Sequence, residues 1–378
     1  MSWEYKTLDQ LGKVSRGRSK HRPRNDPSLF GGKYPFIQTA DVKAANFYIT
    51  EYDTTYNEKG LAQSKLWHPG TLCITIAANI ADTGILAMDA CFPDSVMGFI
   101  PYEGIADVRF VKYSFDILQQ NCKKISQGAA QDNLSWEKLS TILFPVPPIE
   151  VQTKIADILS AYDDLIENNQ KQIKLLEEAA QRLYKEWFVD LRFPGHETTP
   201  IVDGVPEGWR QLALEQIAPI LTGKKDANFS TEDGRYPFFT CAQAPLRAPS
   251  YSFDCNAVIL AGNGDFNVKL YRGKFEAYQR TYVLSPECTE YLYLLYHAVN
   301  NSMVKLAQAA SGSTIKFLTK GMIASIPVYT PEVKNLEKFN TLSEAIQKQI
   351  EVLKKSIANA TEARNRLLPK LMSGEIEV

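Results

Sequence analysis

Two stretches of the chain carry apolar side chains at alternating intervals of three and four residues. The first begins after Pro147 and Pro148, and its repeating positions are Ile155, Leu159, Tyr162, Ile166, Asn169, Ile173, Leu176, Ala180, Leu183 and Trp187. This heptad seam predicts a long helix, from near Glu150 to Asp190, that packs along another helix. At 1.5 Å per residue the helix is roughly 60 Å long, which exceeds the width of a domain of this size, so it must also act as a spacer.

A second seam follows Pro331 and predicts another long helix. Its positions are Leu336, Phe339, Ser343, Ile346, Ile350, Leu353, Ile357, Ala360, Arg364, Leu367 and Leu371. Ser343 and Arg364 are its polar interruptions, and both predicted helices need an apolar partner. On the first seam, a buried Asn169 would fix the register of the helix pair. The alternative is that Asn169 is a solvated position.

Three sequence patterns occur twice in the same order. The pairs are "WEYKTLDQL" (3–11) with "WRQLALEQI" (209–217), "GKYPFIQ" (32–38) with "GRYPFFT" (234–240), and the proline-ended stretch 127–148 with 311–331. Three matches in order indicate a duplication, and a duplicated chain usually arranges its halves about a pseudo-twofold axis. The two long helices would then run antiparallel and bury their seams against each other.

Short β-branched runs between turn residues, such as 71–77 and 256–262, predict strands in the first part of each repeat. We therefore expect an α+β fold, with two repeated globular domains separated by two long helices packed as an antiparallel coiled coil. The expected bounds are a first globular domain over 1–148, the first helix over 149–194, a second globular domain over 195–331 and the second helix over 332–378.

Composition adds little about partners. The 378 residues contain 42 lysines and arginines against 43 aspartates and glutamates, so a charged partner must be recognised by local patches. Six scattered cysteines form no Cys-x-x-Cys pair, and the amino terminus shows no signal peptide. No apolar run approaches the roughly 20 residues of a membrane helix. We expect a soluble protein in a reduced, cytoplasmic setting.

Catalytic motifs are not found. The four histidines, at 21, 68, 196 and 297, have no metal-ligand spacing, and no phosphate-binding Gly-Lys-Ser or Gly-Lys-Thr loop is present. "AGNGDF" (261–266) is better explained as a hairpin turn than as a nucleotide site. "VPPI" (146–149) lacks the asparagine of an amino-methyltransferase loop and indicates a strand-to-helix stop. The chain is expected to hold no active site, metal or cofactor.

The positive chemical signal is a basic loop in each repeat. "RGRSKHRPR" contains Arg16, Arg18, Lys20, Arg22 and Arg24, and its glycine, serine and proline predict a loop suited to phosphates. Lys224 and Lys225 lie next to a glycine in the second repeat, also shortly before a "YPF" strand. A solvated loop without a ligand is the alternative, and the repetition favours nucleic acid.

These residues resemble the specificity subunits of type I restriction-modification systems over essentially the whole chain. The motifs that carry the resemblance are Trp3 and Trp209 with their following leucine, the "YPF" strands at Tyr34 and Tyr236, the "FPVPP" exit at Phe144, "LYKEWFVDLRFPG" (183–195) and "LLPKLMSGEIEV" (367–378). The resemblance implies a non-catalytic subunit with two target-recognition domains for a bipartite site in double-stranded DNA. It also implies two methyltransferase subunits, which bind S-adenosylmethionine, and two motor-nuclease restriction subunits for cleavage.

The resemblance places expected DNA contacts in both repeats. In the first they are Arg16, Arg18, Lys20, Arg22, Arg24, Lys33, Gln38, Gln127, Gly128 and Gln131. In the second they are Lys224, Lys225, Arg235, Thr240, Ser311, Gly312, Ser313 and Lys316. For the glycine turns, a polar hairpin tip is the alternative. Other classes left open are a coiled-coil scaffold that does not bind DNA, a sugar- or ligand-binding β protein and a fused methyltransferase.

Overall fold

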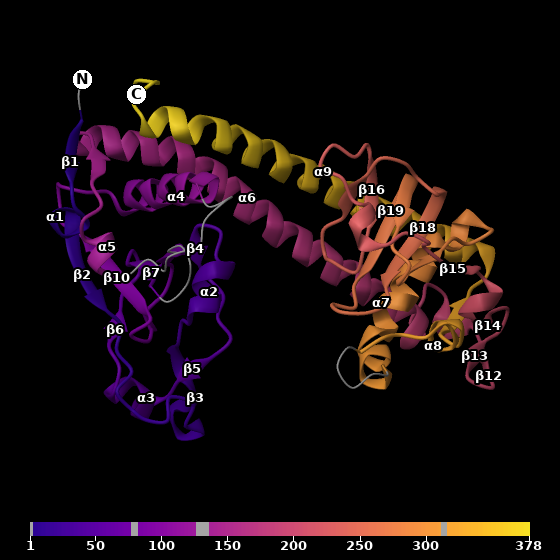
Figure 1. The fold of residues 1–378 in the computed structure, drawn as a ribbon. Coiled ribbons are helices and arrows are strands. Elements are labelled where there is room, and N and C mark those ends of the chain that lie inside the picture. The colour runs from indigo at the N-terminus through magenta and orange to yellow at the C-terminus, as the bar shows by residue number, and fades with distance from the viewer. Residues whose placement is uncertain (1–2, 77–81, 126–135, 311–315) are drawn as a thin grey trace. The chain divides into compact units, whose positions relative to one another are not determined.

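The computed structural model describes residues 3–76, 82–125, 136–310 and 316–378. The chain divides into two compact units, which we name unit 1 and unit 2 (Figure 1). Unit 1 comprises Met1–Lys171 with Lys354–Val378, and unit 2 comprises Gln172–Leu353. Each unit therefore contains a piece of each long helix.

Within the described residues, unit 1 contains a five-stranded sheet in the order β2-β10-β7-β8-β4. Its strands are β1 (Glu4–Lys6), β2 (Gly12–Arg16), β3 (Phe30–Pro35), β4 (Tyr48–Ile49), β5 (Thr55–Tyr56), β6 (Leu66–Trp67), β7 (Leu72–Thr75), β8 (Thr83–Leu86), β9 (Ala90–Cys91), β10 (Val96–Pro101) and β11 (Phe144–Val146). Its short helices are α1 (Leu8–Leu11), the 3-10 turn η1 (Pro27–Leu29), α2 (Thr39–Ala44), α3 (Glu58–Ala62), α4 (Val108–Ile125) and α5 (Trp136–Leu139).

The described part of unit 2 contains a six-stranded sheet in the order β15-β20-β18-β19-β16-β17. Its strands are β12 (Ile201–Val202), β13 (Val205–Pro206), β14 (Arg210–Ala213), β15 (Ile220–Thr222), β16 (Tyr236–Phe239), β17 (Leu246–Ala248), β18 (Phe253–Ala261), β19 (Val268–Ala277), β20 (Thr281–Leu284) and β21 (Pro327–Thr330). Its short helices and 3-10 turns are η4 (His196–Thr198), η5 (Leu214–Gln216), η6 (Ala227–Phe229), η7 (Thr289–Tyr291), α7 (Leu292–Ala309) and α8 (Lys320–Ala324).

The two sheets share a strand order. The order β2-β10-β7-β8-β4 corresponds to β15-β20-β18-β19-β16, and only the last pair of each series, β8 with β4 and β19 with β16, is parallel. An 18-residue helix follows each sheet, α4 in unit 1 and α7 in unit 2. This agreement supports the predicted duplication. The "YPF" segments differ, because Tyr34 lies in β3, which pairs with β5, whereas Tyr236 begins the parallel strand β16.

The repeated tryptophan-leucine-glutamine pattern has a local physical cause. Leu8 and Leu214 are fully buried in the turns that follow β1 in unit 1 and β14 in unit 2. Oε1 of Gln10 accepts a hydrogen bond from the backbone N–H three residues earlier at 3.0 Å, and Oε1 of Gln216 does the same at 2.8 Å. In both units the glutamine thus satisfies a backbone donor at the start of a helical turn.

Both predicted long helices are confirmed as helices. They are α6 (Ile149–Tyr184), continued by a π-helical turn η3 (Lys185–Val189), and α9 (Val333–Met372). Every position of the two predicted seams is buried or partly buried, while apolar residues off the seam, such as Leu165 and Leu175, are exposed. The heptad pattern therefore identified the packed face of each helix.

In unit 1, polar contacts join the middle of α6 to the last part of α9. Asn169 is buried and its Nδ2 donates to Oγ of Ser356 at 3.0 Å, so the solvated alternative for this asparagine is wrong. Nearer the start of α6, the buried carboxylate of Asp163 forms an ion pair with Arg364 and accepts a hydrogen bond from the Tyr113 hydroxyl of α4 at 2.5 Å. The order of these contacts shows that the two helix segments run antiparallel in unit 1.

In unit 2, aromatic side chains join the end of α6 to the start of α9. The ring of Phe339 lies 4.9 Å from Phe188 and 6.4 Å from Tyr184, measured between centroids. His297 of α7 packs against this cluster with a side chain that is only 5% exposed, and its Nδ1 lies 3.4 Å from Oε1 of Gln181. Burial lowers the pKa of His297 from 6.5 to about 4.

Replacing Asp163 by alanine should destabilise unit 1 strongly. The substitution leaves the guanidinium of Arg364 and the hydroxyl of Tyr113 without their acceptor in a largely buried place. We expect the free energy of unfolding in urea to fall by about 3 kcal/mol. The double variant Asp163→Leu with Arg364→Leu removes both charges and should lose clearly less. Equal losses in the single and double variants would show that the unpaired charge is not the cause.

The buried neutral His297 should make the protein less stable at acid pH. Since the unfolded chain takes up a proton near pH 6.5 and the folded chain only near pH 4, stability is lost as the pH falls through this window. Between pH 7 and pH 5 this residue should lower the unfolding free energy by about 2 kcal/mol. In urea titrations His297→Phe, which keeps an aromatic ring, should show a smaller loss by that amount. Parallel pH dependences would contradict this assignment.

Candidate nucleic-acid interface

The basic loop of unit 1 is an extended segment that continues from strand β2. The side chains of Arg16, Arg18 and Lys20 are exposed, whereas Gly17 and Ser19 between them are buried. This alternation follows from the two-residue period of extended backbone. It places three cations on the outer face of one segment.

Hydrogen bonds hold this segment against the rest of unit 1. The backbone N–H of Arg18 donates to the carbonyl of Phe92 at 3.0 Å, and its carbonyl accepts from Oγ of Ser64 at 2.7 Å. The backbone N–H of Lys20 donates to Oε1 of Gln63 at 2.6 Å. The exposed cations therefore sit on a fixed backbone rather than on a free loop.

The other two arginines of the loop are used within the protein. The guanidinium of Arg22 donates to the carbonyls of Ser19 at 2.7 Å and His21 at 2.8 Å, which closes the turn. Arg24 forms an ion pair with Asp94 at 2.8 Å. By contrast, no ion pair between an acidic side chain and Arg16, Arg18 or Lys20 is found in the described part of the chain. Of the five predicted phosphate contacts, these three are the available ones.

A further cation lies beside this loop. Nζ of Lys65 is 3.4 Å from Oγ of Ser15 on β2 and 3.4 Å from the ring centroid of Trp67. Burial, and secondly the charge of Lys13, lowers the pKa of Lys65. No sequence motif indicates Lys65, because it lies far from the basic run along the chain and reaches β2 only through the fold.

Two other predicted residues of unit 1 have local roles. Lys33 is exposed on β3, with Nζ 3.8 Å from a carboxylate oxygen of Glu58. Gln38 precedes α2, where its backbone N–H donates to Asp41 at 2.7 Å and its side-chain amide donates to Oγ1 of Thr54 at 3.3 Å. These contacts give Gln38 a role in starting the helix.

One glycine in each unit sets the path of the cationic segment. Gly17 and Gly223 each follow the first strand of their main sheet, and each lies against the backbone just before that strand's neighbour. A Cβ atom would lie 2.3 Å from the carbonyl oxygen of Pro93 at the first glycine and 1.9 Å from that of Ala277 at the second. No side chain fits either place. The cations of the two units thus occupy equivalent positions.

Backbone hydrogen bonds gather several loops at one end of the unit 2 sheet. These loops contain residues 223–226, 240–246, 262–267, 278–281 and 316–318, and we call them the unit 2 loop end. The bonds are Gln279 N–H to Lys225 O (3.0 Å), Tyr278 N–H to Phe239 O (2.9 Å), Gly262 N–H to Arg280 O (2.9 Å) and Leu318 N–H to Gly262 O (2.8 Å). The predicted residues Lys224, Lys225, Thr240 and Lys316 all lie here.

Side chains of β19 and its preceding loop fix loop 240–246. Nδ2 of Asn267 donates to the carbonyl of Cys241 at 2.9 Å, and Nζ of Lys269 donates to the carbonyl of Ala242 at 2.9 Å. Burial lowers the pKa of Lys269. The next side chain, Gln243, is exposed. An exposed amide on a fixed loop is a group that can hydrogen-bond to base edges.

The remaining predicted residues do not join these sites. Arg235 lies at the opposite end of the four-residue strand β16 from Thr240, with its guanidinium 5.8 Å from the Tyr236 ring centroid. The glycine-turn predictions fall outside the described residues; they are Gln127, Gly128, Gln131, Ser311, Gly312 and Ser313.

The two motifs that the sequence analysis interpreted as a turn and a strand-to-helix stop have these roles in the structure. Residues 261–266 contain the turn between β18 and β19, where Gly264 has φ +68, and residues 146–149 connect β11 to α6. Among the described residues, no group of three or more His, Cys, Asp and Glu side chains could hold a metal ion. No helix in the same ranges is long and apolar enough to cross a membrane.

The chain resembles known proteins over most of its length. The family described as Type I restriction modification DNA specificity domain matches residues 1–178 and 206–363. The type I restriction enzyme MjaIX specificity subunit of Methanocaldococcus jannaschii is 26% identical in an alignment that covers 100% of this chain and 94% of that one. The type I restriction enzyme EcoDI specificity subunit of Escherichia coli is 38% identical over 178 residues, which span 46% of this chain and only 39% of that relative.

A solved structure has a similar fold. The crystal structure of a type I restriction-modification system S subunit from M. genitalium matches with a TM-score of 0.62 and 14% sequence identity, covering 98% of this chain and 96% of that chain. At this identity the likeness concerns the fold alone.

The three available cations of the basic loop should contact phosphates. Each phosphate contact contributes about 0.9 to the slope of log affinity against log salt. Replacing Arg16, Arg18 and Lys20 together by alanine should therefore flatten that slope by roughly 2.7 if all three make contacts. The measurement is the affinity of the full chain for duplex DNA at several salt concentrations.

The matched control removes three exposed lysines of unit 1 that lie outside the loop. Its substitutions are Lys43→Ala, Lys154→Ala and Lys355→Ala, which change the net charge by the same amount. The control should keep the slope of the unmodified chain. If both triple variants flatten the slope equally, net charge and not the loop carries the binding.

Proposed function

Because the chain belongs to the type I restriction-modification DNA specificity family, we propose that it recognises an asymmetric, bipartite target in double-stranded DNA. Each unit recognises one half of that target. The observation that carries the proposal is the pair Gly17 and Gly223, which supports equivalent cationic segments on two sheets of the same strand order. Because the loops around these glycines differ in sequence, the two half-sites should be unlike.

Within each unit, cations position the DNA and amides select bases. Arg16, Arg18 and Lys20 of unit 1 contact phosphates, which contribute affinity without sequence information. Lys224 and Lys225 have the same role in unit 2. A cation–π contact stabilises the Lys225 side chain, with its Nζ 4.4 Å from the ring centroid of Phe229. Gln243 donates to and accepts from base edges. Lys33, Gln38, Arg235, Thr240, Lys316 and the two glycine turns remain proposed contacts.

The long helices separate the two half-sites. Helix α6 has 36 residues and α9 has 40, so at 1.5 Å per residue each extends over about 54 to 60 Å. We propose that they form an antiparallel coiled coil, with Asn169 fixing its register. The buried seams and the contacts of Asp163 with Arg364 in unit 1 support this arrangement.

The chain itself is proposed to be non-catalytic. Two methyltransferase subunits, which hold S-adenosylmethionine, would carry out methylation, and two motor-nuclease subunits would be needed for cleavage. The helices and the units they join provide docking surfaces for these subunits. The complex acts on DNA in the cytoplasm.

The proposal is tested by the methylation pattern of the reconstituted complex. The full chain, assembled with the host's methyltransferase subunits, should methylate a site of two unlike halves separated by a fixed spacer. Sequencing of modified bases on genomic DNA gives the site directly. A palindromic site, or a pattern that does not depend on this chain, would contradict the proposal.

The same assay tests whether the unit 2 loop end recognises bases in one half-site. Gln243→Ala should relax one position of one half-site by about tenfold (~1.4 kcal/mol) and leave the other half unchanged, because a base contact contributes about 1 to 3 kcal/mol to discrimination. The matched control is Gln349→Ala, an exposed glutamine in the long helix α9, which should leave both halves unchanged. Relaxation of both half-sites by Gln243→Ala would show that each unit does not recognise its own half.

A further inference from the structure

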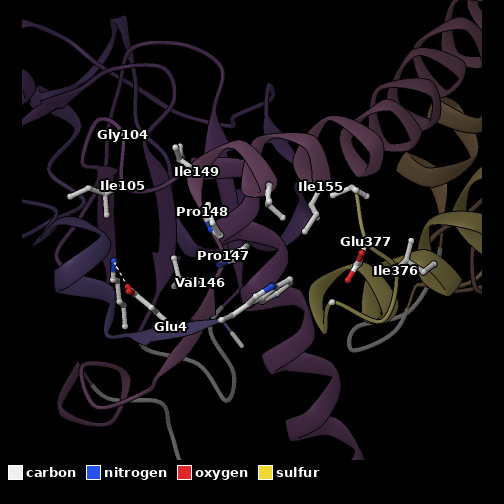
Figure 2. A pocket seen from close by; sticks show the side chains of 15 residues that line it. Glu4, Gly104, Ile105, Val146, Pro147, Pro148, Ile149, Ile155, Ile376 and Glu377 are labelled. Atoms are coloured by element: carbon white, nitrogen blue, oxygen red, sulfur yellow. Dashed lines mark ion pairs between the residues drawn. The ribbon is translucent and has the colours of Figure 1, made fainter. Parts of the chain in front are cut away.

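A groove of about 560 Å³ lies beside Trp3, wholly within unit 1 (Figure 2). Its apolar lining includes Trp3, Ile105, Val146, Ile149, Ile155 and Ile376. Strands β1 and β11 form one side, the start of α6 forms another, and the segment after α9 lies across from the strands. Charged groups at the groove are Glu4, which forms an ion pair with Lys6 at 3.1 Å, and Glu377.

Unit 2 shows how the equivalent tryptophan is covered. Trp209 begins the second copy of the tryptophan-leucine-glutamine pattern, and it is only 7% exposed. Two rings from the segment after α6 pack on it, Phe193 at 4.4 Å and Phe188 at 5.5 Å between centroids. The segment 185–195 therefore fills in unit 2 the place that corresponds to the unit 1 groove.

The segment after α9 lacks those rings. When the seams of the two long helices are aligned, Leu371 corresponds to Trp187, Met372 corresponds to Phe188 and Glu377 corresponds to Phe193. Gly374 of this segment lies beside Trp3, and a Cβ atom there would be 3.2 Å from the indole ring. Leucine, methionine and glutamate thus stand where unit 2 has aromatic rings, and the groove beside Trp3 stays open.

We propose that this groove is the docking site for an aromatic side chain on a segment of the methyltransferase subunit. The inference rests on the proposed function, which requires that subunit as a protein partner. An aromatic ring is the occupant that the equivalent place in unit 2 already holds. Nucleic acid is disfavoured because Lys6, the only cation among the described residues that line the groove, is paired with Glu4, and because Glu377 is acidic.

The strand beside the groove favours an extended protein segment. In the described part of the chain, β1 pairs only with β11, so its other edge has backbone donors and acceptors without a strand partner. A segment that lies along this edge can form main-chain hydrogen bonds while its aromatic side chain enters the groove. An aromatic anchor in an apolar pocket is a common source of interface affinity.

A peptide tests the chemistry of the occupant. The probe is KEWFVDLRFPG, residues 185–195 of this chain, and its control has the tryptophan and both phenylalanines replaced by alanine. The labelled aromatic peptide should bind the full chain in fluorescence anisotropy, and the alanine peptide should not. Ile149→Trp, which fills the groove, should weaken binding at least tenfold. Equal binding of both peptides would overturn the proposal.

Assembly with the methyltransferase subunit tests the partner. Ile149→Trp should weaken that assembly by about 30-fold (~2 kcal/mol). The matched control is Val333→Trp, the first residue of α9 in unit 2 as Ile149 is the first of α6; it should assemble like the unmodified chain. Should Ile149→Trp misfold, Ile376→Glu places a charge in the groove from an exposed position and should weaken assembly similarly.

The outcomes separate this proposal from the proposed function. Normal assembly by folded Ile149→Trp and Ile376→Glu variants overturns the docking site, even if the peptide binds. Failure of the proposed function would give a different result. The unmodified chain would then assemble with the methyltransferase subunit, but methylation would show no bipartite sequence preference.

Discussion

The core of each unit depends on side chains from both long helices. In unit 1, Ile155 and Leu159 of α6 pack in one cluster with Leu368 and Leu371 of α9. The buried carboxylate of Asp163 nearby is balanced by Arg364 from α9, and a buried charge is costly without such a partner. Unit 1 therefore cannot complete its core until the last part of the chain is present. Along the chain, unit 2 is one continuous segment, and unit 1 is made of the two segments that precede and follow it.

Periodic and local features could be predicted from the sequence. The two seams identified the buried faces of α6 and α9 because helix packing follows a repeat that is visible in a single stretch. The repeated glutamines, Gln10 and Gln216, each bond to the backbone N–H three residues earlier, so their role is local too. The duplication was visible because some of its structural residues, such as Leu8 and Leu214, are fully buried in both units.

The parts of the site that depend on tertiary contacts could not be predicted. Charge alone did not separate Arg22, which bonds backbone carbonyls, from Arg18, which faces outward. Lys65 and Lys269 reach the sites from distant positions along the chain, so no motif contains them. Gly17 could be recognised as a loop residue, but its close approach to the backbone at Pro93 follows only from the sheet order. The helices and the repeat could therefore be predicted from the sequence, whereas the structure was needed to identify which charged groups are exposed.

The central claim, that the helices set the distance between the half-sites, has a direct test. Inserting one heptad after Leu176 in α6 and one near Ile350 in α9 keeps both seams in phase and lengthens the pair by about 10 Å. Since B-DNA rises about 3.4 Å per base pair, the preferred spacer should grow by one to three base pairs, with reduced affinity because the added pairs also rotate one half-site. The half-site sequences should not change. The measurement is the distance between methylated half-sites before and after insertion, and an active, folded variant that keeps the original spacer would contradict the account.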